Sequence, residues 1–365
     1  MAITSILMPK WGLAMEEGTV VEWLKSEGDV VAEGDELVEI ETSKITNVME
    51  AQMPGPLRKL VAPVGETLPV GALIAILAEE GDSDADVEAF IDDFNANFVV
   101  QAASGDEASG PETAHVDGYD LTYQTVPGGD GAPVIMLHGF GGDRNNWLFN
   151  QDALAADRDV ILLDLPGHGS STKAISDAGL SALAALVLNF AKAIEVNAFH
   201  LMGHSMGGAI ALEAARQNSD TVLSVLGVCP AGLEAQVNSA FIDTFIEAER
   251  RKGMKEAALL LFADKDLVTR DLVNDLLKFK RLDGVDAALQ ALRSGVIADC
   301  NAAPIPLGDI KAPICVIIGE QDEIIAPPVN LPPTIEAVRL PVGHMAHMEG
   351  AAAVNKAATE FFAKA

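Results

Sequence analysis

The sequence predicts a multidomain protein in which a small all-β barrel or sandwich precedes a mostly parallel α/β domain with a helical lid. Three observations predict this fold class: a repeat within the first eighty residues, an acidic stretch after it, and short apolar runs alternating with helical patterns from Tyr119 onward. We therefore expect the β domain over residues 1–80, a linker over 81–115 and the α/β domain over 116–365, with the lid at about 233–306.

Composition limits the partners and the compartment. The formal net charge of -30 over 365 residues argues against nucleic acid or an anionic membrane as the main partner. The three cysteines, Cys229, Cys300 and Cys315, fit neither a disulfide framework nor a zinc motif, which indicates a reducing compartment. The first residues lack the features of a signal peptide, and no apolar run is long enough to cross a membrane. We expect a cytoplasmic protein.

The first eighty residues contain two copies of one pattern. Each copy is rich in Val, Ile and Leu between glycine-containing turns, which is typical of short antiparallel strands. Two such halves related by a two-fold axis would close a small barrel or sandwich, with Lys44 at the hairpin tip that joins them. The glycines that recur after 37 residues are Gly18/Gly55, Gly28/Gly65 and Gly34/Gly71, and the apolar pairs are Val20/Leu57, Leu24/Val61, Leu37/Ile74 and Ile40/Leu77.

This stretch resembles a lipoyl domain of the kind carried by the acyltransferase components of 2-oxo acid dehydrogenase complexes. The resemblance implies that Lys44 carries lipoate in amide linkage, although Ser43 stands where the family has an acidic residue. Biotin is the nearest rival, but a biotinyl site has Met on both sides of the lysine, and Ser43 and Ile45 do not supply that. The matching segments are residues 8–10, 17–18, 28–29 and 38–42 and the closing Gly71.

The linker is rich in acidic and small residues, and such a stretch cannot bury enough apolar area to fold alone. Apolar residues within it nevertheless fall at helical spacing, with Asp and Glu on the opposite side. We favour a short amphipathic helix that packs back on one of the chain's own domains, and the alternative is a helix that docks a partner. The apolar residues are Val87, Phe90, Ile91, Phe94 and Phe98.

The second domain reads as alternating strands and helices. The expected strands are residues 121–126, 134–137, 160–164, 200–202, 224–228, 314–318 and 337–340. The expected helices are 146–155, 180–194, 206–218 and 351–364, and those of the lid are 241–252, 255–262, 269–281 and 285–294.

One motif organises this domain. The sequence Gly-His-Ser-Met-Gly-Gly at 203–208 follows an apolar run and precedes an alanine-rich helical pattern. A strand that ends in G-x-S-x-G and continues into a helix makes a sharp turn that presents the serine hydroxyl. Backbone N–H groups at the start of that helix can stabilise an oxyanion. Ser205 is therefore a candidate nucleophile.

Two further loops extend the pattern: His-Gly-Phe-Gly-Gly at 138–142 and Asp-Leu-Pro-Gly-His-Gly-Ser-Ser at 164–171. With 203–208 they resemble the α/β-hydrolase family, specifically its lid-bearing members, from about residue 119 to 365. In that family the chain order is nucleophile, acid, histidine. Asp322, after the strand 314–318, matches the acid, and His344, after the strand 337–340, matches the base.

The resemblance gives each residue a role. Ser205 is a poor nucleophile until a base removes its proton, and His344 has a reference pKa near neutrality. Asp322 would fix the tautomer of His344 and stabilise its protonated form. The backbone N–H groups of Phe140 and Met206 would form the oxyanion hole.

Other residues compete for these roles. His347 could be the base, but the family histidine directly follows a glycine, so His347 is interpreted as structural. Glu320 and Glu323 flank Asp322, which holds the family position of the acid. His138, His168 and His204 belong to loop motifs and are interpreted as shaping turns, and Cys229 as a core residue.

The lid carries two basic clusters on an otherwise acidic chain: Arg250, Arg251 and Lys252, and Lys278, Lys280 and Arg281. We favour a solvated helix face that balances nearby carboxylates. The alternative is that one cluster contacts the phosphates of a coenzyme A substrate.

Together the two halves imply acyl transfer from acyl-dihydrolipoyl-Lys44 to a thiol through acyl-Ser205. The whole chain resembles the dihydrolipoamide acetyltransferase components of bacterial acetoin-cleaving systems. That resemblance implies coenzyme A as the acyl acceptor and lipoate as the cofactor. It also implies two partners: a thiamine-diphosphate-dependent acetoin-cleaving enzyme and a dihydrolipoamide dehydrogenase. Two alternatives remain open, a lipoyl-tethered serine hydrolase and a lipoyl carrier whose hydrolase-like half is a silent scaffold.

Overall fold

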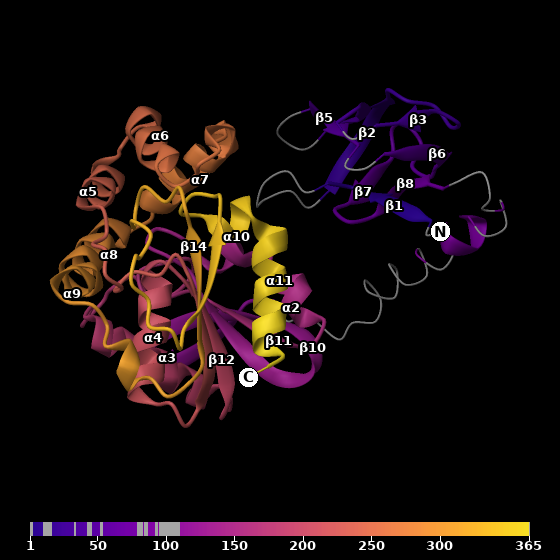
Figure 1. Ribbon diagram of the computed structural model, residues 1–365. Helices are drawn as coiled ribbons and strands as arrows, with labels where there is room; N and C mark the ends of the chain where they lie inside the picture. The colour runs from indigo at the N-terminus through magenta and orange to yellow at the C-terminus, as the bar shows by residue number, and fades with distance from the viewer. Residues whose placement is uncertain are drawn as a thin grey trace. The chain divides into compact units, whose positions relative to one another are not determined.

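The computed structural model describes residues 3–9, 17–32, 34–41, 46–51, 54–78, 83, 87–91, 94 and 110–364 (Figure 1). The chain forms two compact units, Met1–Glu107 and Ala108–Ala365, and each is described by itself. In the described part of the chain, no helix has the length and apolar character needed to cross a membrane.

The first unit consists of two four-stranded antiparallel sheets, with strand orders β1-β8-β6-β3 and β5-β4-β2-β7. The sequence repeat relates β2 to β6, β3 to β7 and β4 to β8. When each of these strands is replaced by its counterpart in the other copy, the strand order of one sheet becomes that of the other, with β1 and β5 at equivalent ends. This is the two-fold arrangement predicted from the repeat. The strands are β1 (Thr4–Leu7), β2 (Glu17–Trp23), β3 (Val30–Val31), β4 (Glu36–Glu41), β5 (Thr46–Glu50), β6 (Gly55–Leu60), β7 (Thr67–Pro69) and β8 (Leu73–Leu77).

Backbone conformation and burial follow the repeat as well. Gly28 and Gly65 have φ values of 95° and 90°, a left-handed conformation that favours glycine at both turns. The pairs Val20/Leu57, Leu37/Ile74 and Ile40/Leu77 are buried in one core. The fourth pair is different, because Leu24 is 37% exposed. The repeat therefore specifies the core at three of the four predicted apolar pairs.

Lys44 lies outside the described residues. Strands β4 and β5 pair antiparallel, with Glu41 opposite Thr46. Residues 42–45 therefore connect the ends of a hairpin, which is the chain position expected for Lys44.

A helical segment at residues 87–91 packs on the first unit. Val87 and Ile91 are buried against Leu73 and Ile76 of β8, with Phe94 packed alongside. These contacts match the interpretation that the linker helix packs on its own domain, and Phe98 lies outside the described residues. The expected end of the linker at residue 115 is wrong, because residues 112–115 already belong to β9 (Glu112–Val116), a strand of the second unit.

The second unit is built on a mostly parallel sheet with the order β11-β10-β12-β13-β14-β15 and β9 paired antiparallel to β10. The strands are β10 (Tyr119–Leu137), β11 (Arg158–Leu163), β12 (Phe199–His204), β13 (Val222–Val228), β14 (Ile314–Gly319) and β15 (Glu336–Leu340). The aliphatic runs of β11, β12, β13 and β14 are buried on both faces, as expected for a parallel sheet, whereas the edge strand β15 is exposed or half-buried along its length.

Strand β10 contains two of the predicted strands. In the first arm, Tyr123 lies opposite Leu163 and Val126 lies opposite Val160. In the second arm the order is reversed, because Val134 lies opposite Val160 and Leu137 lies opposite Leu163. The two arms therefore run in opposite directions along β11. The predicted strands 121–126 and 134–137 are these arms, and the chain between them continues as strand.

Helices cover both faces of this sheet (Figure 1). One face packs against α3 (Leu180–Ala193) and α4 (Met206–Gln217), and the other against α2 (Gln151–Ala155) and α11 (Ala351–Phe362). The helix predicted over 146–155 is wrong in extent, since η1 (Arg144–Trp147) and α2 are separate.

The lid follows β13. Its elements are α5 (Ser239–Glu247), α6 (Arg251–Leu259), η2 (Lys265–Leu267), α7 (Arg270–Lys280), α8 (Val285–Leu292), the π-helical turn η3 (Arg293–Ile297) and α9 (Ala298–Ala302). Two short elements, η4 (Leu307–Asp309) and α10 (Ala346–Glu349), complete the unit. The expected helix 241–252 is divided, because Ala248 and Arg250 have extended backbone conformations between α5 and α6.

Candidate active site

Ser205 lies at a sharp turn between β12 and α4. Its backbone has φ 52° and ψ −115°, which a non-glycine residue rarely adopts. The turn is held by hydrogen bonds: the Ser205 N–H donates to Val228 O at 3.0 Å, and Ser205 O accepts from the N–H of Ala231 at 3.0 Å. Ser205 is 7% exposed. The strand–turn–helix context predicted for the motif is present.

The glycines of the motif are required by close backbone contacts. A Cβ atom at Gly203 would lie 2.3 Å from the carbonyl oxygen of Gly207. A Cβ atom at Gly207 would lie 2.3 Å from the carbonyl oxygen of Leu137, at the end of the central strand β10. The turn is therefore packed against its neighbours on both sides of Ser205.

Asp322 and His344 come together from the loops after β14 and β15. His344 Nδ1 lies 2.7 Å from Asp322 Oδ2, and both side chains are 2% exposed. The other carboxylate oxygen, Oδ1, accepts the N–H groups of Ile324 at 2.7 Å and Ile325 at 2.9 Å. If His344 Nδ1 carries the proton donated to Asp322, Nε2 keeps the lone pair that a general base needs.

The loop after β10 approaches Ser205 closely. A Cβ atom at Gly139 would lie 3.3 Å from Ser205 Cβ, so the next residue, Phe140, is near the serine. In the described part of the chain, neither the Phe140 N–H nor the Met206 N–H has a hydrogen-bond acceptor. Two unpaired backbone donors beside a serine are suited to bind a developing oxyanion.

His138 and His168 hold this loop in place. His138 Nε2 accepts the Leu165 N–H at 3.0 Å, and His168 Nε2 accepts the Gly141 N–H at 3.0 Å. Burial lowers the pKa of His138, and it lowers that of His168 well below the usual value. Both imidazoles are therefore neutral and structural, as the sequence indicated.

His347 and His204 are also buried. Burial lowers the pKa of His347 to about 3 and that of His204 well below its usual value. His347 packs against the rings of Trp147 and His204, with centroids 4.7 and 4.4 Å apart. His204 Nε2 lies 3.0 Å from the backbone oxygen of His344 and supports the position of that residue. These contacts do not place His347 against Asp322.

Glu349 is a site residue that the sequence analysis missed. Its carboxylate accepts the N–H groups of Gly343 at 2.6 Å, Asp264 at 2.7 Å and Ala263 at 3.2 Å. It thus joins the loop that carries His344 to the lid beyond α6. No local pattern reveals this role, because two of the three donors, Ala263 and Asp264, lie 86 and 85 residues away in the chain.

The lid covers the site. Phe245 of α5 stacks edge-on against Phe140, with ring centroids 5.8 Å apart, and Phe279 of α7 stacks on His168 at 5.7 Å. Gly141 has φ 75°, and a Cβ atom there would lie 2.5 Å from the Phe245 ring. The aromatic side chains of two lid helices therefore pack directly on the two loops beside Ser205.

The basic clusters of the lid differ in their surroundings. Lys280 is largely buried and donates to the backbone oxygen of Ile246, and Lys278 pairs with Asp275 at 2.8 Å. Arg250 and Lys252 are exposed, and the described ion pairs include neither of them. The first cluster therefore has charge available to a ligand, whereas the second is mostly used within the fold.

Two protein-family models match the chain. The alpha/beta hydrolase fold matches residues 132–351, which is more than half of the chain, and the model described as biotin-requiring enzyme matches residues 4–77. The dihydrolipoyllysine-residue acetyltransferase component of acetoin cleaving system from Pseudomonas putida is 43% identical over 99% of this chain and 99% of its own length. The corresponding component from Cupriavidus necator is 41% identical over 96% of this chain and 94% of its own. The chain belongs to this family of acetyltransferase components.

Solved structures agree on the fold of this acetyltransferase component. The meta-cleavage product hydrolase from Pseudomonas fluorescens IP01 has a TM-score of 0.61 and 19% identity, over 69% of this chain and 97% of its own. At this identity the similarity concerns the fold alone. The predicted fold class, a lipoyl-type domain followed by an α/β-hydrolase fold, is confirmed.

Proposed function

We propose that the protein transfers an acetyl group from a dihydrolipoyl thioester on Lys44 to coenzyme A through an acyl-Ser205 intermediate. The observation that carries this proposal is the union, in one chain, of a lipoyl-type domain with a strained Ser205 turn and a buried Asp322–His344 pair, joined by the contact of the neighbouring His204 with the backbone of His344. When bound, lipoate on Lys44 supplies the acetyl group as a thioester at the end of a long arm. The antiparallel β4–β5 hairpin supports this attachment, since its connection contains Lys44.

In the first half-reaction, His344 Nε2 accepts the Ser205 proton as Oγ attacks the thioester carbonyl. Asp322 stabilises the imidazolium that forms, and the N–H groups of Phe140 and Met206 bind the oxyanion. As the tetrahedral adduct collapses, His344 returns the proton to the departing thiol. Ser205 is left as an acetyl ester.

In the second half-reaction, His344 removes the proton of the coenzyme A thiol, whose sulfur attacks acetyl-Ser205. The second tetrahedral adduct uses the same two backbone donors. Its collapse restores the Ser205 hydroxyl with the proton held by His344. Atoms and charges therefore balance over the two steps, and one thioester is exchanged for another.

Membership in the acetoin-system family supports two partners. We propose a thiamine-diphosphate-dependent enzyme that cleaves acetoin and loads the arm, and a dihydrolipoamide dehydrogenase that reoxidises it. Acyl transfer from one free thiol to another requires reducing conditions. The three free cysteines agree with such conditions, so we propose the cytoplasm as the location.

Product analysis with acetyl-dihydrolipoamide, with and without coenzyme A, tests the acceptor. Acetyl-coenzyme A should form with the wild type and not with Ser205→Ala, while Ser205→Ala should keep its fold. Acetate released at the same rate with and without coenzyme A would instead favour a lipoyl-tethered hydrolase. No turnover with either acceptor would favour a carrier with a silent scaffold.

Intact-mass measurement after expression with lipoate tests the modified residue. One lipoyl adduct is expected, and Lys44→Arg should remove it. Lys25→Arg is the matched control, because Lys25 lies in the same half of the repeat and pairs with Asp35. An adduct that survives Lys44→Arg would contradict the assignment.

A further inference from the structure

Cys229 has no role in the proposed reaction, yet it lies beside the acid and the base. It follows β13 directly and has a left-handed backbone with φ 43°, which is rare for a residue with a side chain. Its N–H donates to Ile317 O at 2.8 Å, and its side chain is buried. The fold thus holds this thiol in an unfavourable backbone conformation at the back of the site.

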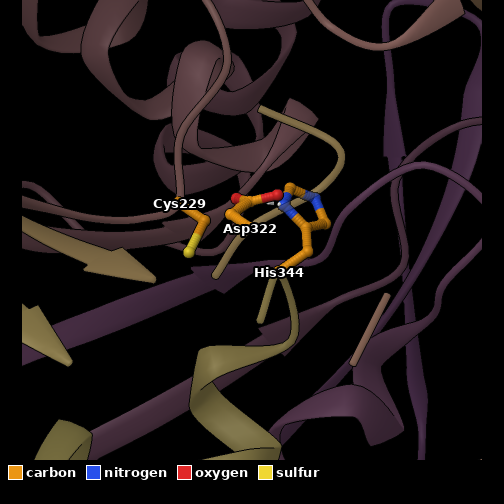
Figure 2. A group of neighbouring side chains, drawn as sticks. All are labelled: Cys229, Asp322 and His344. Carbon is orange, nitrogen blue, oxygen red and sulfur yellow. Dashed lines mark hydrogen bonds and ion pairs between the residues drawn. The ribbon is translucent and has the colours of Figure 1, made fainter. Parts of the chain in front are cut away.

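Figure 2 shows the Asp322 carboxylate between the Cys229 thiol and the His344 ring. Their ligand atoms, one thiol sulfur, one carboxylate oxygen and one imidazole nitrogen, lie within 4.8 Å of one another. Sulfur, nitrogen and oxygen in this combination form the donor set that zinc accepts. Among the described residues, no other group of three His, Cys or carboxylate side chains meets this condition.

A small cavity adjoins the group. Its volume is about 10 Å³, roughly the room for one water molecule, and both Cys229 and Asp322 line it. The rest of the lining is apolar and includes Leu233, Ile325 and Pro327. The cavity therefore has room beside two of the three side chains for one water ligand of a metal ion.

We propose that Cys229, Asp322 and His344 form an inhibitory site for a thiophilic divalent cation such as Zn²⁺ or Cd²⁺. Tetrahedral zinc requires ligand distances of about 2.3 Å to sulfur and about 2.0–2.2 Å to nitrogen and oxygen. The His344–Asp322 contact of 2.7 Å must therefore open slightly, and the thiol must move toward the pair. Three protein ligands leave the fourth position to water.

Binding of the cation to His344 stops the reaction because it removes the general base. Coordination by Nδ1 moves the imidazole proton to Nε2, so His344 loses the lone pair that accepts the Ser205 proton. The thiol of Cys229 loses its proton to solvent, and the thiolate sulfur binds the ion. One proton is thus released for each ion bound, and no electron is transferred. Removal of the ion restores the original tautomer, so the inhibition is reversible by a chelator.

The experiment uses the full chain with Lys44→Arg, because a reduced lipoyl dithiol would itself bind the metal. Cd²⁺ is titrated while the ultraviolet cadmium–thiolate absorption is recorded, and hydrolysis of p-nitrophenyl acetate is followed in parallel. One thiolate band that saturates together with the loss of hydrolysis is expected, and a chelator should reverse both. Cys229→Ser should retain hydrolysis. It should bind Cd²⁺ at least about 10- to 100-fold more weakly, because loss of even an outer-shell partner costs that much affinity and Cys229 is a direct ligand.

Cys315→Ser is the matched control, since Cys315 is also free and buried but lies in β14 away from the group. It should keep the full band and full inhibition. Asp322→Asn and His344→Ala remove the other two ligands and should weaken Cd²⁺ binding even if Cys229→Ser does not fold. Unchanged Cd²⁺ binding in these variants would overturn the proposal. Loss of hydrolysis without a thiolate band, when the Lys44→Arg chain with all three ligands is titrated, would overturn it too. The absorption readout does not depend on acyl transfer, so it stands apart from the test of the proposed function.

Discussion

Two histidines three positions apart, His344 and His347, are both buried but have different partners. Only His344 contacts a carboxylate, whereas His347 packs against aromatic rings and has a pKa of about 3. We predict that His344→Ala lowers acyl transfer as much as Ser205→Ala, by about 10⁴-fold or more, because the members of a triad act as a unit. His347→Phe should remain active. Rates at pH 7.5 check this, and an inactive His347→Phe that is still folded would contradict it.

Glu349 provides a second prediction at the scale of the residue. Its carboxylate accepts three backbone N–H groups that join the His344 loop to the lid. Hydrogen bonds to a charged group contribute about 1.5–3 kcal/mol each, so Glu349→Gln should lower the free energy of unfolding by about 2 kcal/mol. Glu323→Gln is the control, since Glu323 makes an exposed ion pair. Denaturant unfolding measures both, and equal losses would contradict the special role of Glu349.

At the scale of the element, the linker helix is held by a small apolar contact. Ile91 is 8% exposed and packs against β8 of the first unit. Ile91→Ala should destabilise that unit by about 2 kcal/mol or more and leave the α/β unit unchanged. Calorimetry of the intact chain can follow the two transitions, with the exposed Glu88→Gln as control. A shift confined to the α/β transition would contradict the packing.

The lid provides the other prediction at this scale. Arg250 and Lys252 are exposed, while Lys278 is already paired with Asp275. If the first cluster contacts coenzyme A phosphates, Arg250→Gln with Lys252→Gln should raise the KM for coenzyme A by up to about fivefold per cation. The KM for a short pantetheine acceptor should stay unchanged, and Lys278→Gln should change neither. An unchanged KM for coenzyme A would make the cluster a solvated helix face.

Sequence patterns predicted elements better than they predicted contacts. The repeat and the buried strands are local or periodic signals, so the strand content of both units and the order of the domains were predictable. The bend of β10 and the strand β9 were not, because each depends on pairing with a distant segment. Likewise Ser205, Asp322 and His344 stand at recognisable motif positions. Glu349 and the contact of Cys229 with the Asp322–His344 pair arise only when loops far apart in the chain meet.

At the scale of the whole molecule, the two units differ in the residue type that titrates near neutral pH. All seven histidines lie after residue 107, so the first unit has none. Burial lowers the pKa of His200 to about 4 and that of His347 to about 3. These groups bind protons more readily in the unfolded chain, where their pKa is about 6.5. Their contribution to stability is therefore complete above pH 6.5 and is lost as the pH falls toward 4 and 3.

This asymmetry predicts that mild acid destabilises only the α/β unit. Between pH 7.5 and pH 5, the titrations of His200 and His347 should lower its free energy of unfolding by about 4 kcal/mol, and the lowered pKa values of His138, His168 and His204 add to this loss. The melting temperature should then fall by at least roughly 10 °C. The transition of the first unit should stay where it is, since the lowered pKa of Asp35 affects stability only below its usual value of 3.8. Calorimetry of the intact chain at both pH values measures this. In His347→Phe the loss of stability should be smaller by about 2 kcal/mol, because one of the titrations of buried histidines is removed. Equal shifts of both transitions would show that the buried histidines do not control the acid sensitivity.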